Sequence, residues 1–364
     1  MSDPALGSAG ATGSPARQPA LEAPHRRRPP GPRLLEKGTV LAYRGASWLL
    51  AHVPPPLSRT VIGTGAQASY LAWPTKRRWS NENFGHVLGL PPGDPRVRRL
   101  ALRAYREYAR YLVELMRLPS LPAATRARLV EGVELDGLEQ IWKESPGGLI
   151  LVIAHVGNNE AVAAGVATRG WPVSVVADDS SFPEMFELLR RQRESWGVHV
   201  IPWRNLRGIY AVLRRREMLA LLVDWGYRPD GIPVRLFDAW TTLPAGPATL
   251  AAKTNSWILP IVIRRAGPDR FHLSWTEPIA ARSSDKPELQ RVTQEIARAL
   301  EHTIGSAPEQ WYNFKPIWPA TAEESAGLEA RAAVIRDRAG PAAGGGPAAG
   351  DQPVATPVAS ATDE

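Results

Sequence analysis

The chain has 364 residues, a formal net charge of +8 at pH 7 and no cysteine. This length allows one or two domains with a large core. The absence of cysteine excludes disulfides and thiolate metal sites. It also means that cysteine content does not indicate whether the protein works in an oxidising or a reducing compartment. No signal peptide is expected, because the basic cluster near the N-terminus is not followed by an apolar stretch and a cleavage site.

The two ends of the chain differ in composition from the middle. Residues 1–33 are rich in Pro, Ala, Gly and Arg, and residues 339–364 are rich in Ala, Gly and Pro. Neither segment has enough apolar residues to offset the entropy of ordering, so both are predicted to be disordered tails. Between them we expect an N-terminal helical region (34–118), an α/β domain (119–320) and a C-terminal helix (321–338).

Two apolar segments, 39–53 and 57–73, open the helical region and are separated by three prolines. Each is too short for a confident membrane span and contains an arginine. Trp and Tyr residues stand at their ends, which is typical of helices that lie in the headgroup layer of a membrane. The alternative is a pair of ordinary packing helices.

A surplus of basic residues follows, between Thr75 and Arg117. Residues 97–118 carry apolar positions at helical spacing, with six arginines on the other face. The basic face is either solvated or directed at an anionic membrane surface. No nucleic-acid-binding motif accompanies it, so nucleic acid is not an expected partner.

The stretch 147–164 (GGLILVIAHVGNNEAVAA) organises the rest of the chain. The apolar run 149–153 predicts a buried strand of a parallel sheet, and it stops at His155. Turn residues and a helix-forming segment follow. Asp224 stands in the same way just after the apolar strand 218–223. Ligands bind at the carboxyl ends of parallel strands, so His155 and Asp224 could converge on one cleft.

His155 and Glu160 form an H-x-x-x-x-E motif. They can meet if His155 lies on the turn and Glu160 lies in the first helical turn. A carboxylate that holds an imidazole lets it take a proton from a substrate hydroxyl. The same spacing recurs at His272 and Glu277, but there it lies in an alternating strand and would point the two side chains to opposite faces.

Beyond this stretch, strands and helices alternate. The expected strands are 173–177, 198–201, 218–223, 257–263 and 271–275, and the expected helices are 182–196, 206–216 and 288–304. This order predicts an α/β sandwich with a mostly parallel sheet. The Gly- and Pro-rich segment 226–247 is predicted to be a long functional loop.

Three blocks resemble the bacterial lipid A biosynthesis lauroyl/myristoyl acyltransferase family of the lysophospholipid acyltransferase superfamily, including its branch that acylates phosphatidylinositol mannosides. The resemblance extends from about residue 41 to residue 318. The blocks are HVGNNE at 155–160, Asp224 with PVRLF at 233–237 and AGPATLA at 245–251, and PEQWYNFKPIW at 308–318. The stretch ESWG at 194–197 looks closer to the mannoside branch.

The resemblance implies a glycerol-phosphate-acyltransferase-like sandwich, held to the cytoplasmic face of the cell membrane by its N-terminal helices. His155 would be the general base, with Glu160 as its partner. Arg193 and Asp224 would bind substrate, and Asn158 would either orient the turn or donate to an oxyanion.

The implied reaction moves an acyl chain from acyl-carrier protein or acyl-coenzyme A to a hydroxyl of a glycolipid or phospholipid, with no other cofactor and no metal. One alternative is a thioesterase or lipid hydrolase that uses the same base, although the chain has no G-x-S-x-G nucleophile motif. The other is a non-catalytic basic protein at the membrane periphery.

Overall fold

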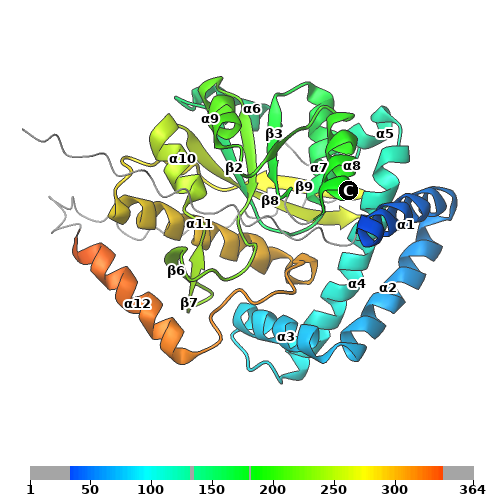
Figure 1. Ribbon diagram of the computed structural model, residues 1–364, viewed down its shortest axis with the longest axis horizontal. Coiled ribbons are helices and arrows are strands. Elements are labelled where there is room, and N and C mark those ends of the chain that lie inside the picture. The colour runs from blue at the N-terminus through cyan, green and yellow to red at the C-terminus, as the bar shows by residue number, and fades with distance from the viewer. Residues whose placement is uncertain (1–32, 132–134, 180–181, 339–364) are drawn as a thin grey trace, which may run out of the picture.

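The computed structural model describes residues 33–131, 135–179 and 182–338. The predicted tails lie outside these ranges, apart from Arg33, at which the first helix begins. The described chain forms a seven-stranded sheet with helices on both faces (Figure 1). The predicted α/β class with a mostly parallel sheet is therefore confirmed.

The strand order explains how distant residues reach one edge of the sheet. The order is β1 (Val130–Glu131), β9 (Arg270–Trp275), β8 (Trp257–Gly267), β2 (Leu149–Ile153), β5 (Met218–Leu222), β3 (Val173–Ala177) and β4 (His199–Pro202). Strand β2 lies at the centre, parallel to both β5 and β8, and β9 runs antiparallel to β8. Ile153 pairs with Leu222, so β2 and β5 end side by side.

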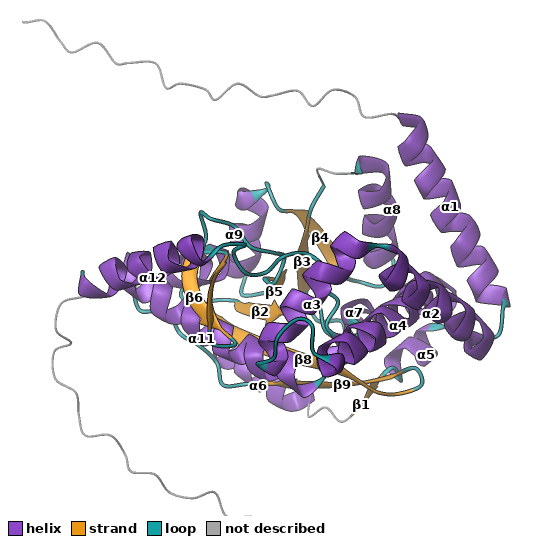
Figure 2. Cartoon of the chain, turned by 90° about the horizontal axis from the view of Figure 1, so that it is seen from below, coloured by secondary structure: helices purple, strands orange, loops and turns teal. Residues whose placement is uncertain are grey.

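Each face of the sheet carries its own core, because alternate residues of β2 point to opposite sides. Ile150 and Val152 pack in the core of the first face, and Leu151 and Ile153 in that of the second. The first face is covered by α9 (Leu206–Arg214), α10 (Gly246–Thr254) and α11 (Lys286–Ser306). The second is bordered by α6 (Leu135–Glu144), α7 (Asn159–Val166) and α8 (Pro183–Glu194) (Figure 2).

Four helices precede the sheet: α1 (Arg33–His52), α2 (Pro55–Ala72), α3 (Pro74–Leu88) and α4 (Pro95–Arg117). Helix α4 buries part of its predicted stripe, including Val97, Leu100 and Tyr105, against the first core. Helices α1 and α2 instead keep large apolar side chains exposed, among them Leu41 and Trp48. Within the described ranges no helix is both long and apolar enough to cross a bilayer. Their membrane association stays a prediction.

The predicted long loop 226–247 is in fact largely a β-hairpin. Strands β6 (Ile232–Leu236) and β7 (Ala239–Leu243) pair antiparallel. Phe237 and Asp238 turn between them with φ values of 49° and 59°, in the left-handed region where Gly or Asn is usual. The hairpin packs on α11 and on α12 (Ala322–Asp337). This contact explains why a segment without a clear alternating pattern forms strands.

Short helical turns complete the described chain. They are η1 (Leu118–Ser120), α5 (Ala123–Ala127), η2 (Ala167–Arg169) and η3 (Pro308–Gln310). The last of these matters for function, because the segment after it returns to the carboxyl ends of β2 and β5.

Candidate active site

His155 lies on a tight turn two residues after β2. The turn requires Gly157, whose φ is +70° and whose Cβ, if present, would lie 2.7 Å from the Ile263 carbonyl oxygen. The segment after η3 holds the turn from the other side. The amide of Tyr312 donates to the His155 carbonyl oxygen at 2.8 Å, and the Gly157 amide donates to the carbonyl oxygen of Gln310 at 3.1 Å. The backbone of His155 is therefore fixed on both sides.

The carboxylate that contacts the imidazole belongs to Asp224. His155 Nδ1 lies 2.6 Å from Asp224 Oδ1, and the His155 amide donates to Asp224 Oδ2 at 3.0 Å. Trp311 Nε1 donates to the same Oδ2 at 2.8 Å, and the Asn313 side chain donates to the Asp224 carbonyl oxygen. Asp224 is 2% exposed, whereas the His155 side chain is 28% exposed. One ring nitrogen is thus held by a buried acid while the ring remains accessible.

The same contacts set the protonation of the pair. Burial lowers the pKa of the His155 imidazole, but the charge and hydrogen bond of Asp224 outweigh it and hold that pKa above its ordinary value. The charge of Lys315 acts in the opposite direction and lowers the pKa of His155. Burial raises the pKa of Asp224, but His155 and the hydrogen bond from Trp311 bring it below its ordinary value. The Asp224 carboxylate can therefore stabilise an imidazolium formed next to it.

Glu160, which the sequence assigns to His155, binds Arg193 instead. Arg193 Nη2 lies 2.5 Å from Glu160 Oε1, and Arg193 Nε lies within 3.1 Å of both carboxylate oxygens. The predicted contact between His155 and Glu160 is thus replaced by two separate pairs. The reason is local: α7 begins at Asn159, and its first turn directs Glu160 toward α8, which carries Arg193.

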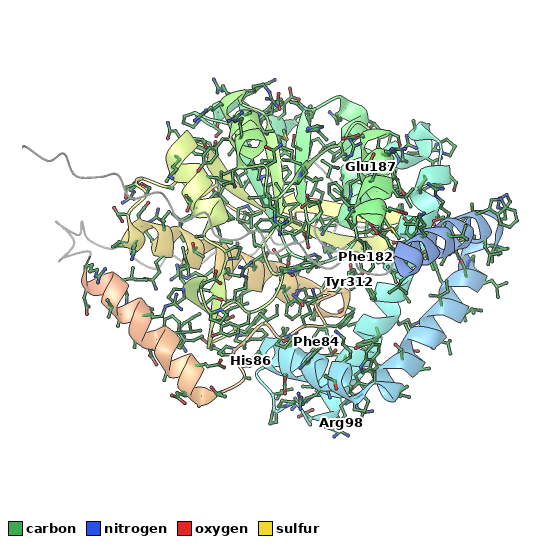
Figure 3. The ribbon with its side chains drawn as sticks, viewed as in Figure 1. Phe84, His86, Arg98, Phe182, Glu187 and Tyr312 are labelled. Atoms are coloured by element: carbon green, nitrogen blue, oxygen red, sulfur yellow. The ribbon has the colours of Figure 1, made fainter. Side chains whose placement is uncertain are left out.

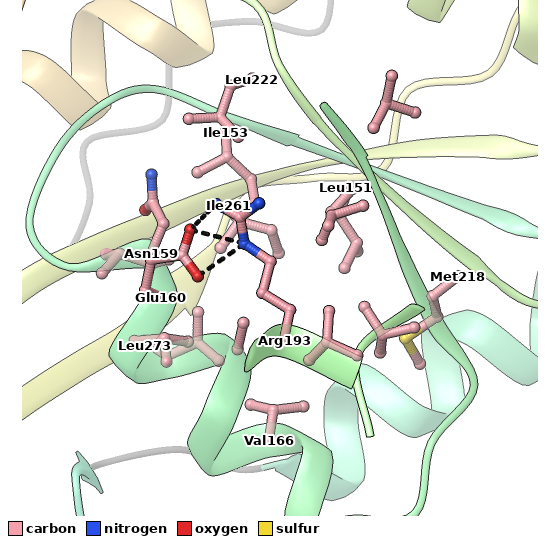
Figure 4. Close-up of a pocket in the computed structure, with 18 of the residues that line it drawn as sticks. Leu151, Ile153, Asn159, Glu160, Val166, Arg193, Met218, Leu222, Ile261 and Leu273 are labelled. Carbon is pink, nitrogen blue, oxygen red and sulfur yellow. Dashed lines mark hydrogen bonds and ion pairs between the residues drawn. The ribbon is translucent and has the colours of Figure 1, made fainter. Parts of the chain in front are cut away.

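An apolar cavity of about 120 Å³ lies between the second face of the sheet and the helices α7 and α8 (Figure 4). Its floor consists of residues from the five strands β2, β3, β5, β8 and β9, such as the alternate residues Met218, Ala220 and Leu222 of β5. Met218 and Leu222 are four residue steps apart, so the lining of this slot extends about 13 Å along β5. The ion pair of Glu160 and Arg193 is among its few polar lining groups.

The cavity adjoins the turn that carries His155. Ile153 and Asn159, which stand on either side of His155 in the sequence, both line it. A proton-accepting imidazole beside a narrow apolar slot fits the transfer or cleavage of a long-chain acyl group.

Comparison with known proteins identifies the family. The family model described as bacterial lipid A biosynthesis acyltransferase matches residues 29–319. The chain belongs to this family. It is 26% identical over 292 residues to the phosphatidylinositol mannoside acyltransferase of Mycolicibacterium smegmatis, covering 78% of this chain and 92% of the relative. It is also 26% identical over 305 residues to the protein of that name from Mycobacterium tuberculosis, covering 80% and 91%. The chain is an acyltransferase.

Two of the residues expected to bind substrate in this acyltransferase lie behind the turn that carries His155 instead. Asp224 is buried and engaged with His155 and Trp311, so it faces the base and not a ligand. Asn158 is fully buried: its side-chain oxygen accepts from the Ala161 amide at 2.9 Å, and its Nδ2 donates to Glu114 at 3.0 Å. Of the two roles considered for Asn158, its contacts fit orientation of the turn.

The sequence alone did not indicate a role for several residues that surround His155 in this acyltransferase. Trp311 and Asn313 hold Asp224, and Trp225 and Lys315 lie on the open side of His155. Three of them belong to the block 308–318. The aromatic and amide residues of this block could have indicated a functional role. The sequence does not show, however, that the block pairs with the turn at Val156.

Proposed function

We propose that this acyltransferase moves a fatty acyl chain from acyl-carrier protein or acyl-coenzyme A to a hydroxyl group of a membrane glycolipid or phospholipid, of the lipid A or phosphatidylinositol mannoside class. The observation that carries the proposal is the His155–Asp224 pair beside an apolar slot. The names of the two mycobacterial relatives support the mannoside class of acceptor.

In the proposed reaction, His155 acts as the general base through Nε2, since Nδ1 is held by Asp224. The imidazole takes the proton of the acceptor hydroxyl as its oxygen attacks the thioester carbonyl carbon. The carbon–sulfur bond of the tetrahedral intermediate then breaks, and the imidazolium returns the proton to the leaving thiolate. Asp224 fixes the ring tautomer and offsets the charge on the imidazolium. No covalent enzyme intermediate and no further cofactor are required.

The acyl chain of the donor is proposed to lie in the apolar slot. Burial of methylene groups there supplies about 0.8 kcal/mol for each CH₂ removed from water. Glu160, in the first turn of α7 after His155, and Arg193 on α8 both line this slot. We assign Arg193 to the carbonyl end of the acyl group, and Glu160 to holding the guanidinium in that position.

We further propose that the protein binds the cytoplasmic face of the cell membrane as a peripheral or monotopic protein. Exposed apolar side chains occur on α1 (Leu35, Leu41, Trp48 and Leu49), on α2 and its C-cap (Leu57, Val61, Leu71 and Trp73), on the loops after β3, β4 and β5 (Phe182, Trp203 and Trp225) and at the start of α9 (Leu206). The loop that carries Phe182 leads into α8, which contacts α1 (Figure 3). Lys37 and Arg44 on α1 add positive charge suited to anionic lipid.

Sedimentation with anionic vesicles tests this attachment. A Leu41→Asp, Trp48→Asp double variant should bind at least tenfold more weakly than the wild type, because both side chains would otherwise enter the headgroup layer. Val334→Asp on α12 replaces another exposed apolar residue, 51% exposed against 72% for Leu41 and 67% for Trp48, and serves as the control. Equal binding by all three proteins would rule out α1 as a membrane contact.

The reaction itself is tested by radiolabelled acyl transfer in membranes that contain the wild type or His155→Ala, followed by chromatography of total lipids. A labelled glycolipid or phospholipid made only by the wild type is the expected result. Release of free fatty acid at a rate independent of added lipid would instead indicate a hydrolase. Vesicle binding without turnover of any acyl donor would indicate a non-catalytic protein.

A further inference from the structure

An exposed aromatic ring and a lysine lie together on the open side of His155. The Trp225 ring centroid is 5.7 Å from that of His155, and the Trp225 side chain is exposed. Lys315 Nζ lies over the Trp225 ring, 3.9 Å from its centroid. A cation over an indole face at this distance is an attractive contact that orients both side chains.

The backbone on both sides of this contact is fixed. Asp224, which precedes Trp225, accepts from the Asn313 side chain through its carbonyl oxygen. The Lys315 carbonyl oxygen accepts from Asn83 Nδ2 at 2.7 Å, and the Tyr227 amide donates to the carbonyl oxygen of Pro316 at 2.9 Å. These hydrogen bonds hold the loop after β5 and the segment after η3 together, and they place Lys315 beside His155.

Lys315 differs from the other cations of this region in its charge environment. Arg193 is paired with Glu160, and Arg228 lies 3.3 Å from the carboxylate of Asp230. No carboxylate of the described residues lies within 4 Å of Lys315 Nζ. An accessible cation with an oriented side chain and no acidic partner suits an anionic ligand.

We propose that Lys315, oriented by Trp225, binds a phosphate group of a substrate during acyl transfer. This inference rests on the proposed function, since two substrates of that reaction carry phosphate: a phospholipid acceptor has a phosphodiester, and the coenzyme A or carrier-protein donor has a phosphopantetheine arm. The ammonium group acts as a point charge on the phosphate oxygens. The reactive hydroxyl or the thioester is thereby brought to His155.

The same lysine also acts on the base. Two charged groups face the His155 ring among the described residues, Asp224 from the loop after β5 and Lys315 from the segment after η3. Asp224 raises the pKa of His155 and Lys315 lowers it. A variant without the Lys315 charge should therefore have a base that becomes neutral only at higher pH.

Steady-state kinetics of the full-length chain with Lys315→Met test the proposal. If the ligand is the acceptor phosphate, the KM for the phospholipid acceptor should rise about tenfold and that for the donor should not. If it is the donor phosphate, the KM for acyl-coenzyme A should rise, while that for acyl-pantetheine, which lacks phosphate, should not. In both cases Lys315→Arg should restore most of the affinity. In Lys315→Met, the fall of kcat/KM on the acid side of the pH profile (the acid limb) should move to higher pH. Lys286→Met, an exposed lysine at the start of α11, is the control.

The proposal is overturned if Lys315→Met changes neither KM by more than twofold. Calorimetric titration with coenzyme A and with a soluble short-chain phosphatidylinositol separates its failure from that of the proposed function. Weaker binding of one of these probes to Lys315→Met than to the wild type supports the phosphate site even if no acyl transfer is found. If Lys315→Met binds both probes as tightly as the wild type does, the phosphate site is refuted.

Discussion

Asp224 and Glu114 are both buried carboxylates that join distant segments, and the groups around them differ. Glu114 on α4 accepts from Arg265 Nη1 at 2.5 Å and Nη2 at 2.9 Å, and Arg59 and Arg110 lie within 4 Å of it. Asp224 faces His155, which can gain or lose a proton and is partly open to solvent. A carboxylate surrounded by permanent cations fixes structure, whereas one opposed by a titratable, accessible partner supports chemistry.

The two sites are connected through the turn that carries His155. Glu114 also accepts from Asn158 Nδ2, and Asn158 caps the helix that begins directly after the turn. The backbone amide of Arg265 donates to Gln310 Oε1 at 2.6 Å, and the Gln310 carbonyl oxygen accepts from Gly157. The Glu114 cluster therefore supports the turn from behind, and the Asp224 pair acts on its exposed side.

The largest effect is expected from removing the base. His155→Ala should lower kcat by about 10⁴-fold, near the upper end of what general-base catalysis contributes. The melting temperature should also fall, because the buried Asp224 carboxylate loses the imidazole that offsets its charge. Acyl-transfer rates and thermal unfolding of the same preparation measure both quantities. Full activity in this variant would remove His155 from the mechanism.

Removing the acid behind the base should have the next largest effect. Asp224→Asn should lower kcat by about 10³-fold, because the ring loses the partner that fixes its tautomer. The base works when neutral, and Asp224 raises the pKa of His155, so the wild-type acid limb should lie above the imidazole's ordinary pKa of about 6.5. In Asp224→Asn the limb should move to lower pH. A pH profile of kcat/KM measures this, and a shift to higher pH would contradict the assignment.

For the Glu114 cluster, the comparison predicts a loss of stability and not of catalysis. Glu114→Ala should destabilise the fold by about 3–5 kcal/mol, because Arg265, 5% exposed, would lose its main partner. Denaturant unfolding measures this free energy. Glu187→Ala on the surface of α8 removes a carboxylate that is also bound by two arginines, and it should leave the midpoint almost unchanged. Similar midpoints for both variants would mean that the buried cluster is not structural.

The smallest effect is expected in the slot. Ala220→Phe should lower kcat/KM for long-chain donors about tenfold and for short-chain donors much less, because the ring would fill the slot at mid-length. A series of acyl donors of increasing length measures the preference. A uniform loss across the series would point to a folding defect and not to a shorter pocket.

Local sequence was sufficient for the six strands β2, β3, β4, β5, β8 and β9 and for the two strand-end residues. Each apolar run of five or six residues predicts a buried strand, and a polar residue directly after such a strand in a parallel sheet comes to the carboxyl edge. His155 and Asp224 were identified in this way. The hairpin β6–β7 was missed because its turn begins with Phe237, a bulky residue that is uncommon at positive φ, and has no Asn-Gly or Asp-Gly pair.

The tertiary structure decided which acid contacts the base. Along the chain Glu160 is five residues from His155 and Asp224 is sixty-nine residues away. In the sheet β5 pairs directly with β2 although β3 and β4 intervene in sequence, so Asp224 arrives beside His155. Meanwhile α7 turns Glu160 toward Arg193. Sequence spacing measures distance along the chain, whereas proton transfer depends on distance in space, and the crossover of strands makes the two differ.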